Sequence, residues 1–196
     1  MLDARPPQTM QRSRGAAAVR LAGRRIVDLR QSGAAKAFLP RSHAPVPEVV
    51  FLNTSGGLTA GDRLEWRLEL DAATAAVATT QTAERGYAAT GDPARVVVDL
   101  RLGAGAALDW LPQETILYDN ARLGRRTRVE MAADARLVWA EMLVLGRVAM
   151  GEQLAEVSLH DRREIHRGGR LALLEPVRLA RGVKLNHPEA IALITD

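Results

Sequence analysis

Turn-forming residues divide this chain into short segments, and that division restricts its fold more than any other feature of the sequence. Glycine, proline and Asp-Asn pairs interrupt the chain at intervals of roughly 8–12 residues. Between these breaks apolar and polar residues alternate, as in Leu64–Leu70, Arg95–Leu102 and Arg122–Met131. A period of two residues is typical of β-strands with one buried face. The pattern predicts an all-β fold, a stack, sandwich or barrel of short strands, and argues against repeated βαβ units.

Further segments fit the same fold. A hairpin is expected about Ala22-Gly23, and additional strands are expected at 75–80, 107–111, 115–118, 136–145, 154–160 and 165–174. Residues 81–89 are ambiguous between a short helix and irregular structure. Residues 1–12 contain Arg5-Pro6-Pro7 and no periodicity, so disorder or extended coil is expected there.

The most distinctive segment is the glycine-rich stretch LNTSGGLTAGD at residues 52–62. A phosphate-binding loop of the Walker type needs Gly-Lys followed by Ser or Thr, whereas Gly61 is followed by Asp62 and Arg63. A dinucleotide fingerprint needs a helix after the glycines, and the residues that follow alternate with period two. The stretch is therefore interpreted as a tight structural bend between two strands.

The amino-acid composition limits the classes of function that this chain can have. The 196 residues include no cysteine, which excludes disulfides and thiolate metal sites, and no apolar run reaches the ~20 residues that span a bilayer. The net charge is +4, but only 4% of the residues are aromatic. An arginine-rich β-domain that binds nucleic acid remains an alternative, although single-strand binding usually uses stacking aromatic residues.

Catalytic groups are poorly represented. None of the histidines lies in a GxSxG or HExxH context, although His160 and His166 flank an Arg-rich segment and would approach one another across a turn. Four acidic residues stand beside structural breaks or within apolar sequence: Asp62, Glu114, Glu141 and Glu152.

Glu141 is the most informative of these acids, because its apolar neighbours indicate burial and a buried carboxylate is costly unless it is paired or solvated. Two interpretations stay open. Either Glu141 pairs with an arginine such as Arg147, or several of the acids line a wet internal passage.

Five motifs in order along the chain resemble the urease accessory protein D family (UreD/UreH). They are GAAKAFLPR at 33–41, LNTSGGLTAGD at 52–62, Thr79-Thr80-Gln81 followed by Glu84 and Tyr87, WLPQETILYDNARL at 110–123, and EMLVLGRVAMGE at 141–152. The resemblance extends from about residue 12 to about residue 179.

This resemblance implies a stacked, helical arrangement of many short β-strands with few helices. It also implies a non-enzymatic, cytoplasmic maturation factor that assists nickel insertion into apo-urease with accessory proteins F and G, the latter a GTPase. No cofactor is expected to be permanently bound, and no nucleic-acid or membrane partner is expected. Nickel is expected in transit, and Asp62, Glu114, Glu141 and Glu152 are the hypothetical residues of its path. Carboxylates hold nickel more weakly than thiolate or imidazole clusters do, which suits transit.

The last residues depart from the family. Residues 181–196 resemble the N-terminal region of the urease γ subunit, and Asn186, His187 and Pro188 predict the start of a short C-terminal helix. The chain is thus expected to combine a UreD-like β domain at 1–180, truncated at its C-terminus relative to the family, with a γ-like helical fragment at 181–196. A non-functional hybrid product is a further alternative.

Overall fold

The computed structural model describes residues 12–41, 43–147, 150–152, 154–179 and 190–195, and within these ranges the chain is almost entirely β-structure. The first half contains β1 (Arg14–Ala22), β2 (Arg25–Gly33), β3 (Ala35–Phe38), β4 (Glu48–Asn53), β5 (Arg63–Leu70), β6 (Ala75–Thr80) and β7 (Glu84–Gly86). The second half contains β8 (Ala94–Leu102), β9 (Ala107–Trp110), β10 (Thr115–Leu117), β11 (Arg122–Met131), β12 (Arg136–Leu145), β13 (Ser158–Arg167), β14 (Arg170–Leu179) and β15 (Ala190–Thr195).

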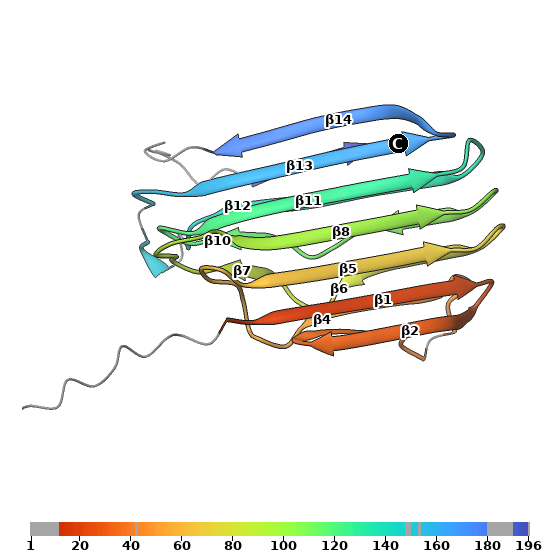
Figure 1. The fold of residues 1–196 in the computed structure, drawn as a ribbon, viewed down its shortest axis with the longest axis horizontal. Helices are drawn as coiled ribbons and strands as arrows, with labels where there is room; N and C mark the ends of the chain where they lie inside the picture. Colours follow the sequence, from red (N-terminus) through yellow and green to blue (C-terminus); the bar gives the residue numbers. More distant parts are fainter. Residues whose placement is uncertain (1–11, 42, 148–149, 153, 180–189, 196) are drawn as a thin grey trace, which may run out of the picture.

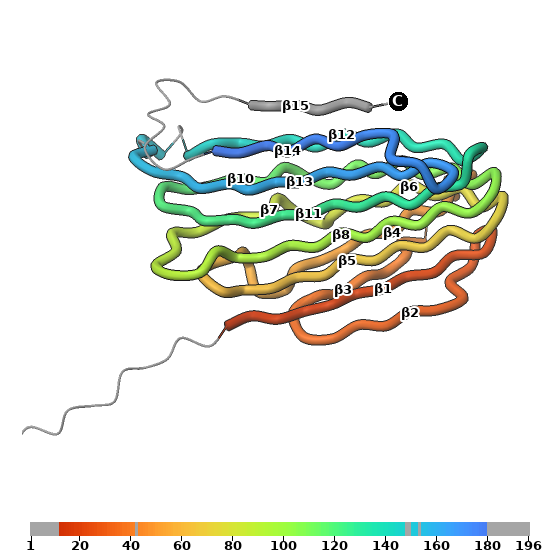
Figure 2. The backbone as a smooth tube through the Cα atoms, turned by 45° about the horizontal axis from the view of Figure 1, so that its top comes forward, coloured from red at the N-terminus to blue at the C-terminus, as the bar shows by residue number. Residues whose placement is uncertain are grey.

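The strands form two layers that lie face to face (Figure 2). Sheet A has the order β14-β13-β11-β8-β5-β1-β2, and its strands run side by side across the front of the molecule (Figure 1). Sheet B has the order β3-β4-β6-β9-β12-β10-β7, with β15 paired to β12. The pairings β1–β5–β8–β11–β13 are all parallel, so the chain crosses from one sheet to the other and back between successive strands of each sheet. This arrangement is a stack of coils, a β-solenoid.

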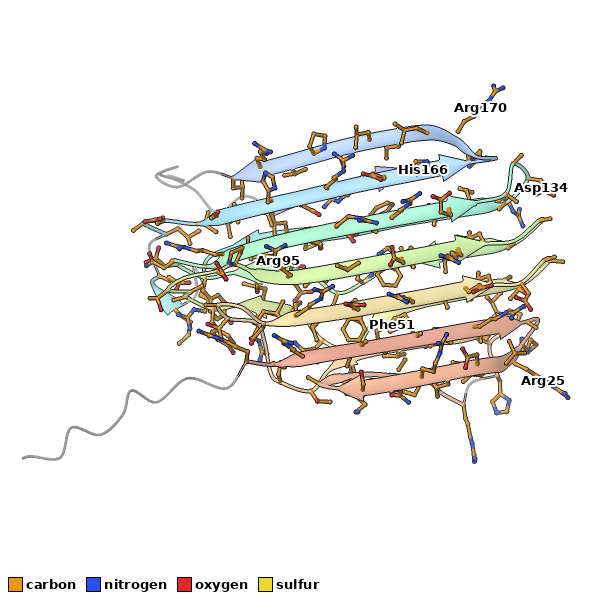
Figure 3. All side chains as sticks on the ribbon, viewed as in Figure 1. Arg25, Phe51, Arg95, Asp134, His166 and Arg170 are labelled. Carbon is orange, nitrogen blue, oxygen red and sulfur yellow. The ribbon has the colours of Figure 1, made fainter. Side chains whose placement is uncertain are left out.

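The core lies between the sheets and follows from the alternation in the sequence. In β5 and β8 every second residue is buried, and the residues between them face solvent. Phe51 packs against Trp66 and Trp110, with ring centroids 5.3 and 6.0 Å away. Phe51 lies behind sheet A in Figure 3. The three rings form an aromatic cluster within the core.

The predicted all-β fold is confirmed, and so are most strands. The hairpin at Ala22-Gly23 joins β1 to β2, and the predicted strands at 122–131 and 136–145 match β11 and β12 residue for residue. The ambiguous residues 81–89 contain β7 rather than a helix. The expectation of disorder at residues 1–12 falls almost wholly outside the described residues.

Two predictions are wrong. The structure has no turn between His160 and His166, because both lie on β13, and the turn falls at Gly168-Gly169 instead. The histidines are six residues apart on one strand and do not approach one another. The second error is the short C-terminal helix: Ala190–Thr195 is β15, which pairs antiparallel with β12.

The physical reason for the second error is the neighbouring edge. A helix of about two turns is too short to be stable alone, whereas the edge of β12 offers unpaired backbone groups to any extended segment that reaches it. The predicted helix cap at 186–188 lies outside the described residues. No helix of the described residues has the length and apolar character needed to cross a bilayer.

Candidate functional site

The first of the four predicted acids, Asp62, closes the glycine-rich bend. Its carboxylate is buried and accepts hydrogen bonds from the backbone N–H of Ser13 at 2.7 Å and of Thr59 at 2.8 Å. The bend itself needs glycine, because Gly57 has φ +144° and a Cβ there would lie 2.4 Å from the Tyr87 ring. Asp62 thus ties the bend to the start of β1.

Glu152 closes the second glycine-bracketed bend. Its Oε2 accepts the backbone N–H of Arg147 at 2.8 Å, and its Oε1 lies 3.0 Å from Arg147 Nη2. The hydrogen bonds from the Arg147 guanidinium hold the pKa of Glu152 below its usual value. The same guanidinium stacks over the Tyr118 ring, 4.2 Å from its centroid. Arg147, proposed from the sequence as a partner of Glu141, pairs with Glu152 instead.

Glu141 is buried, as the sequence predicted, and its partners are two arginines from sheet A. Its Oε2 lies 2.9 Å from Arg125 Nη2 and 3.1 Å from Arg163 Nη2. Its Oε1 accepts the indole N–H of Trp110 at 3.3 Å. The carboxylate therefore projects from β12 across the interior and meets the charges of the opposite sheet.

Asp161 completes this group, which we call the interior charge network: Arg125, Glu141, Asp161, Arg163 and Glu175. Asp161 is paired with Arg125 by two hydrogen bonds, at 3.1 Å through Nε and 2.6 Å through Nη2, and lies 2.8 Å from Arg163 Nη2. Arg163 extends the network to the half-buried Glu175 at 3.1 Å.

Electrostatics explains why this network tolerates burial. Burial lowers the pKa of Arg125, but the attraction of Glu141 and Asp161 outweighs burial, and the net effect raises that pKa. Arg125 faces two carboxylates, Glu141 and Asp161, and Arg163 faces the same two and Glu175 as well. Breaking such a pair leaves an uncompensated buried charge, which costs about 3–5 kcal/mol.

Glu114 and Glu84 lie next to one another on neighbouring segments. Glu84 N–H donates to the backbone carbonyl of Glu114 at 2.9 Å, and Glu84 pairs with Thr115 across β7 and β10. Both Oε atoms of Glu84 accept from Asn53 Nδ2, at 3.1 and 3.2 Å. Burial raises the pKa of Glu84 to about 7.

Glu84 was not among the predicted path residues. The sequence signal that would have selected it is its position between two breaks within the motif at 79–87, but its partner Asn53 is 31 residues away. Because the two residues are so far apart in sequence, no local sequence pattern indicates the environment of the Glu84 carboxylate.

Two small cavities join these groups. The first lies beneath the glycine-rich bend and is lined by Asn53, Gly57, Thr80 and Glu84, among others. The second lies between the sheets and is lined by Glu84, Thr115, Arg125 and Glu141, among others. Each has a volume of about 40 Å³. Glu84 lines both, so it stands between the bend and the interior charge network.

The four predicted acids do not converge on one point. Asp62 and Glu152 serve separate bends, Glu141 belongs to the interior charge network, and Glu114 adjoins Glu84. In the described part of the chain no three His, Asp or Glu side chains are placed to hold one metal ion. The four acids thus lie at separate places in the fold.

Fold and interior together define a two-sheet β-solenoid with charged groups between its layers. The model of the family described as UreD urease accessory protein matches residues 13–193, and this chain belongs to that family. The match continues through residue 193, while the division into two domains at residues 180–181 stays a prediction.

Curated relatives agree with this assignment. The urease accessory protein UreD of Paracoccus denitrificans (strain Pd 1222) is 54% identical over 190 residues, which are 96% of this chain and 68% of the relative. The UreD proteins of Jannaschia sp. (strain CCS1) and Dinoroseobacter shibae (strain DSM 16493 / NCIMB 14021 / DFL 12) are 55% and 53% identical, over 91% and 90% of this chain and 66% and 64% of theirs. The chain thus spans about two thirds of the length of these relatives.

Proposed function

We propose that this chain acts in urease maturation, as a non-enzymatic scaffold and metallochaperone subunit that assists nickel insertion into apo-urease with accessory proteins F and G. Membership of the UreD urease accessory protein family is the observation that carries this proposal. The role places the chain in the cytoplasm with its client enzyme.

Nickel is the cargo of this function, and we propose that it passes through the interior along carboxylates. The two cavities that share Glu84 supply a course from the glycine-rich bend past Glu84 to Glu141, and Glu114 adjoins Glu84 through a backbone hydrogen bond. Asp62 and Glu152 remain hypothetical path residues at the bends. Single carboxylates bind nickel weakly, which suits release.

The charges around the path also favour passage over storage. Arg125 and Arg163 lie within 3.1 Å of Glu141 and repel a dication, so nickel binds only weakly at this point of the path. Glu84 is a neutral or charged carboxyl depending on pH near 7, because burial raises its pKa to that range. A nickel ion that displaces the proton of Glu84 gains a carboxylate ligand at the boundary between the two cavities.

Nickel content of urease matured in cells tests the path. Alanine is placed at Asp62, Glu114, Glu141 and Glu152, separately and together, and glutamine at Glu84. The outer-face residue Glu65, which pairs with Arg63 and Arg67, is the matched control. We expect Glu84→Gln and Glu114→Ala to lower the nickel content while Glu65→Ala keeps it.

The thermal midpoint of each variant separates lost transit from lost folding. Co-purification with accessory protein F and apo-urease tests the partners independently of the path. Full nickel loading with all four predicted acids changed would exclude the path, and a chain that captures neither partner would exclude the maturation role.

A further inference from the structure

One row of basic residues crosses the outer face of sheet A at the starts of its parallel strands. Register places the row members directly opposite one another on β1, β5, β8, β11, β13 and β14: Arg14, Arg63, Arg95, Gly124, His160 and Arg178. We call this set the basic row. Figure 3 labels Arg95 within it, on β8.

Two rows farther along the same face are built differently. One reads Arg20, Glu69, Arg101, Glu130 and His166 across successive strands, and another reads Arg67, Asp99, Arg128 and Glu164. In both rows the sign of charge alternates, and ion pairs such as Arg20–Glu69 and Arg67–Asp99 cross between strands. Opposite charges across strands stabilise a sheet, and like charges directly opposite destabilise it. The basic row therefore carries an electrostatic cost that these two rows avoid, and the row between, in which Arg126 lies opposite Arg162, shares part of that cost.

The charges of the basic row are also largely free. Arg63 pairs with Glu65 at 2.9 Å, but among the described residues Arg14, Arg95 and Arg178 have no carboxylate partner. All three of these residues are exposed. Guanidiniums that face solvent and are unpaired within the described part of the chain are available to an external anion.

Gly124 interrupts the basic row at its centre. Its φ is not positive, and a Cβ there would meet only a backbone oxygen at 3.8 Å, so the strand does not require glycine. A glycine in a strand interior often marks a place where another chain approaches closely. The basic row thus combines unpaired positive charges with one position, Gly124, where no side chain covers the backbone. We call this position the notch.

We propose that the basic row binds an acidic, extended segment of a partner protein. Adjacent strands lie ~4.8 Å apart, so the row is about 24 Å long, the length of about seven residues of extended chain. Carboxylates on one face of such a segment meet the guanidiniums of β1, β8 and β14 in bidentate pairs. The notch at Gly124 admits the backbone of the segment.

A nucleic acid fits this surface less well. The next two rows toward the strand ends carry both signs of charge, because Glu65, Asp99 and Glu164 stand among four arginines, so a phosphate backbone that extends beyond the basic row meets carboxylates as well as guanidiniums. Single strands also need stacking platforms. The one aromatic residue in the described strands of sheet A, Trp66, is buried.

Fluorescence anisotropy with the full chain tests the proposal. The probe is a labelled seven-residue peptide in which glutamate alternates with serine, and a labelled RNA of similar length is the comparison. The row variant is R14Q/R95Q/R178Q. The matched control is R101Q/R167Q/R170Q, which removes the same charge from exposed arginines at the other end of sheet A.

We expect the row variant to weaken peptide binding at least tenfold and the control variant to weaken it less than twofold, with thermal midpoints close to that of the unchanged chain. Binding should fall as salt rises, because exposed charges are screened. Equal losses in both variants, or no binding of the peptide, would overturn the proposal. Tighter binding of the RNA, lost in the row variant, would replace the acidic segment with a nucleic acid and overturn it as well.

Discussion

Replacing Asp161 with asparagine removes the central negative charge of the interior charge network while keeping the shape of the side chain. Asp161 is fully buried and contacts two guanidiniums, at 2.6 Å to Arg125 Nη2 and 2.8 Å to Arg163 Nη2. The new amide keeps one acceptor oxygen, and its NH₂ group faces N–H donors. Glu141 then remains as the buried carboxylate shared by both arginines.

The expected loss is about 3–5 kcal/mol of the free energy of unfolding, since the change breaks two buried pairs and leaves Arg125 with Glu141, which Arg163 shares, as its remaining carboxylate partner in the network. For a chain of this size each kcal/mol lowers the thermal midpoint by roughly 2–4 °C, so Asp161→Asn should lower it by roughly 6–20 °C. The matched control is Asp28→Asn, which breaks the exposed Arg30–Asp28 pair at 3.0 Å. An exposed pair contributes about 0–1 kcal/mol.

Urea unfolding followed by circular dichroism measures both variants. With an m value of about 2 kcal/mol/M, the midpoint for Asp161→Asn should fall by roughly 1.5–2.5 M, while Asp28→Asn moves it by less than about 0.5 M. Similar small shifts in both variants would refute the reasoning that the interior charges depend on mutual compensation.

Further outcomes follow from Glu84 and from the glycines. Because burial raises the pKa of Glu84 to about 7 while the unfolded carboxyl ionises near 4.3, its proton stabilises the fold at low pH, and that stabilisation is lost as the pH rises toward about 7. Unfolding midpoints at pH 5 and pH 8 should therefore differ less in Glu84→Gln than in the unchanged chain, and an unaltered difference would count against a perturbed Glu84. Gly57→Ala should destabilise by more than about 1 kcal/mol, since it combines φ +144° with a 2.4 Å contact to Tyr87. Gly124→Ala, where the new Cβ meets only a backbone oxygen at 3.8 Å, should be neutral or stabilise by about 0.5–1 kcal/mol, and differential scanning calorimetry of the two variants compares them directly.

The sequence predicted the all-β fold because the period of two is strong wherever one face of a strand is wholly apolar, as in β5, β8, β11 and β12. It failed at β13, where the inward positions include Asp161 and Arg163. A run of consecutive charged residues is typical of an exposed turn, and this segment was predicted as one. Asp161 and Arg163 are nevertheless buried, because partners on other strands neutralise their charges.

The site was harder to predict for a related reason. Burial of Glu141 was evident from its apolar neighbours, but its partners Arg125 and Arg163 come from the opposite sheet, and Arg147, the nearest arginine in sequence, pairs elsewhere. The basic row was equally hidden, because its members are placed side by side by strand register, which no single segment of sequence reveals. Local patterns determine which residues face inward, and the order of the strands determines which of them meet.

The parallel stacking of coils has a consequence for how the molecule loses its structure. Each strand from β1 to β13 in sheet A pairs with its immediate neighbours in the stack, so disruption spreads from one coil to the next and begins most readily at the terminal coils. Amide protons in β5, β8 and β11 should thus exchange with solvent more slowly than those of β2 and β14. In such a stack a terminal coil can unfold when a partner binds there, while the central coils stay ordered.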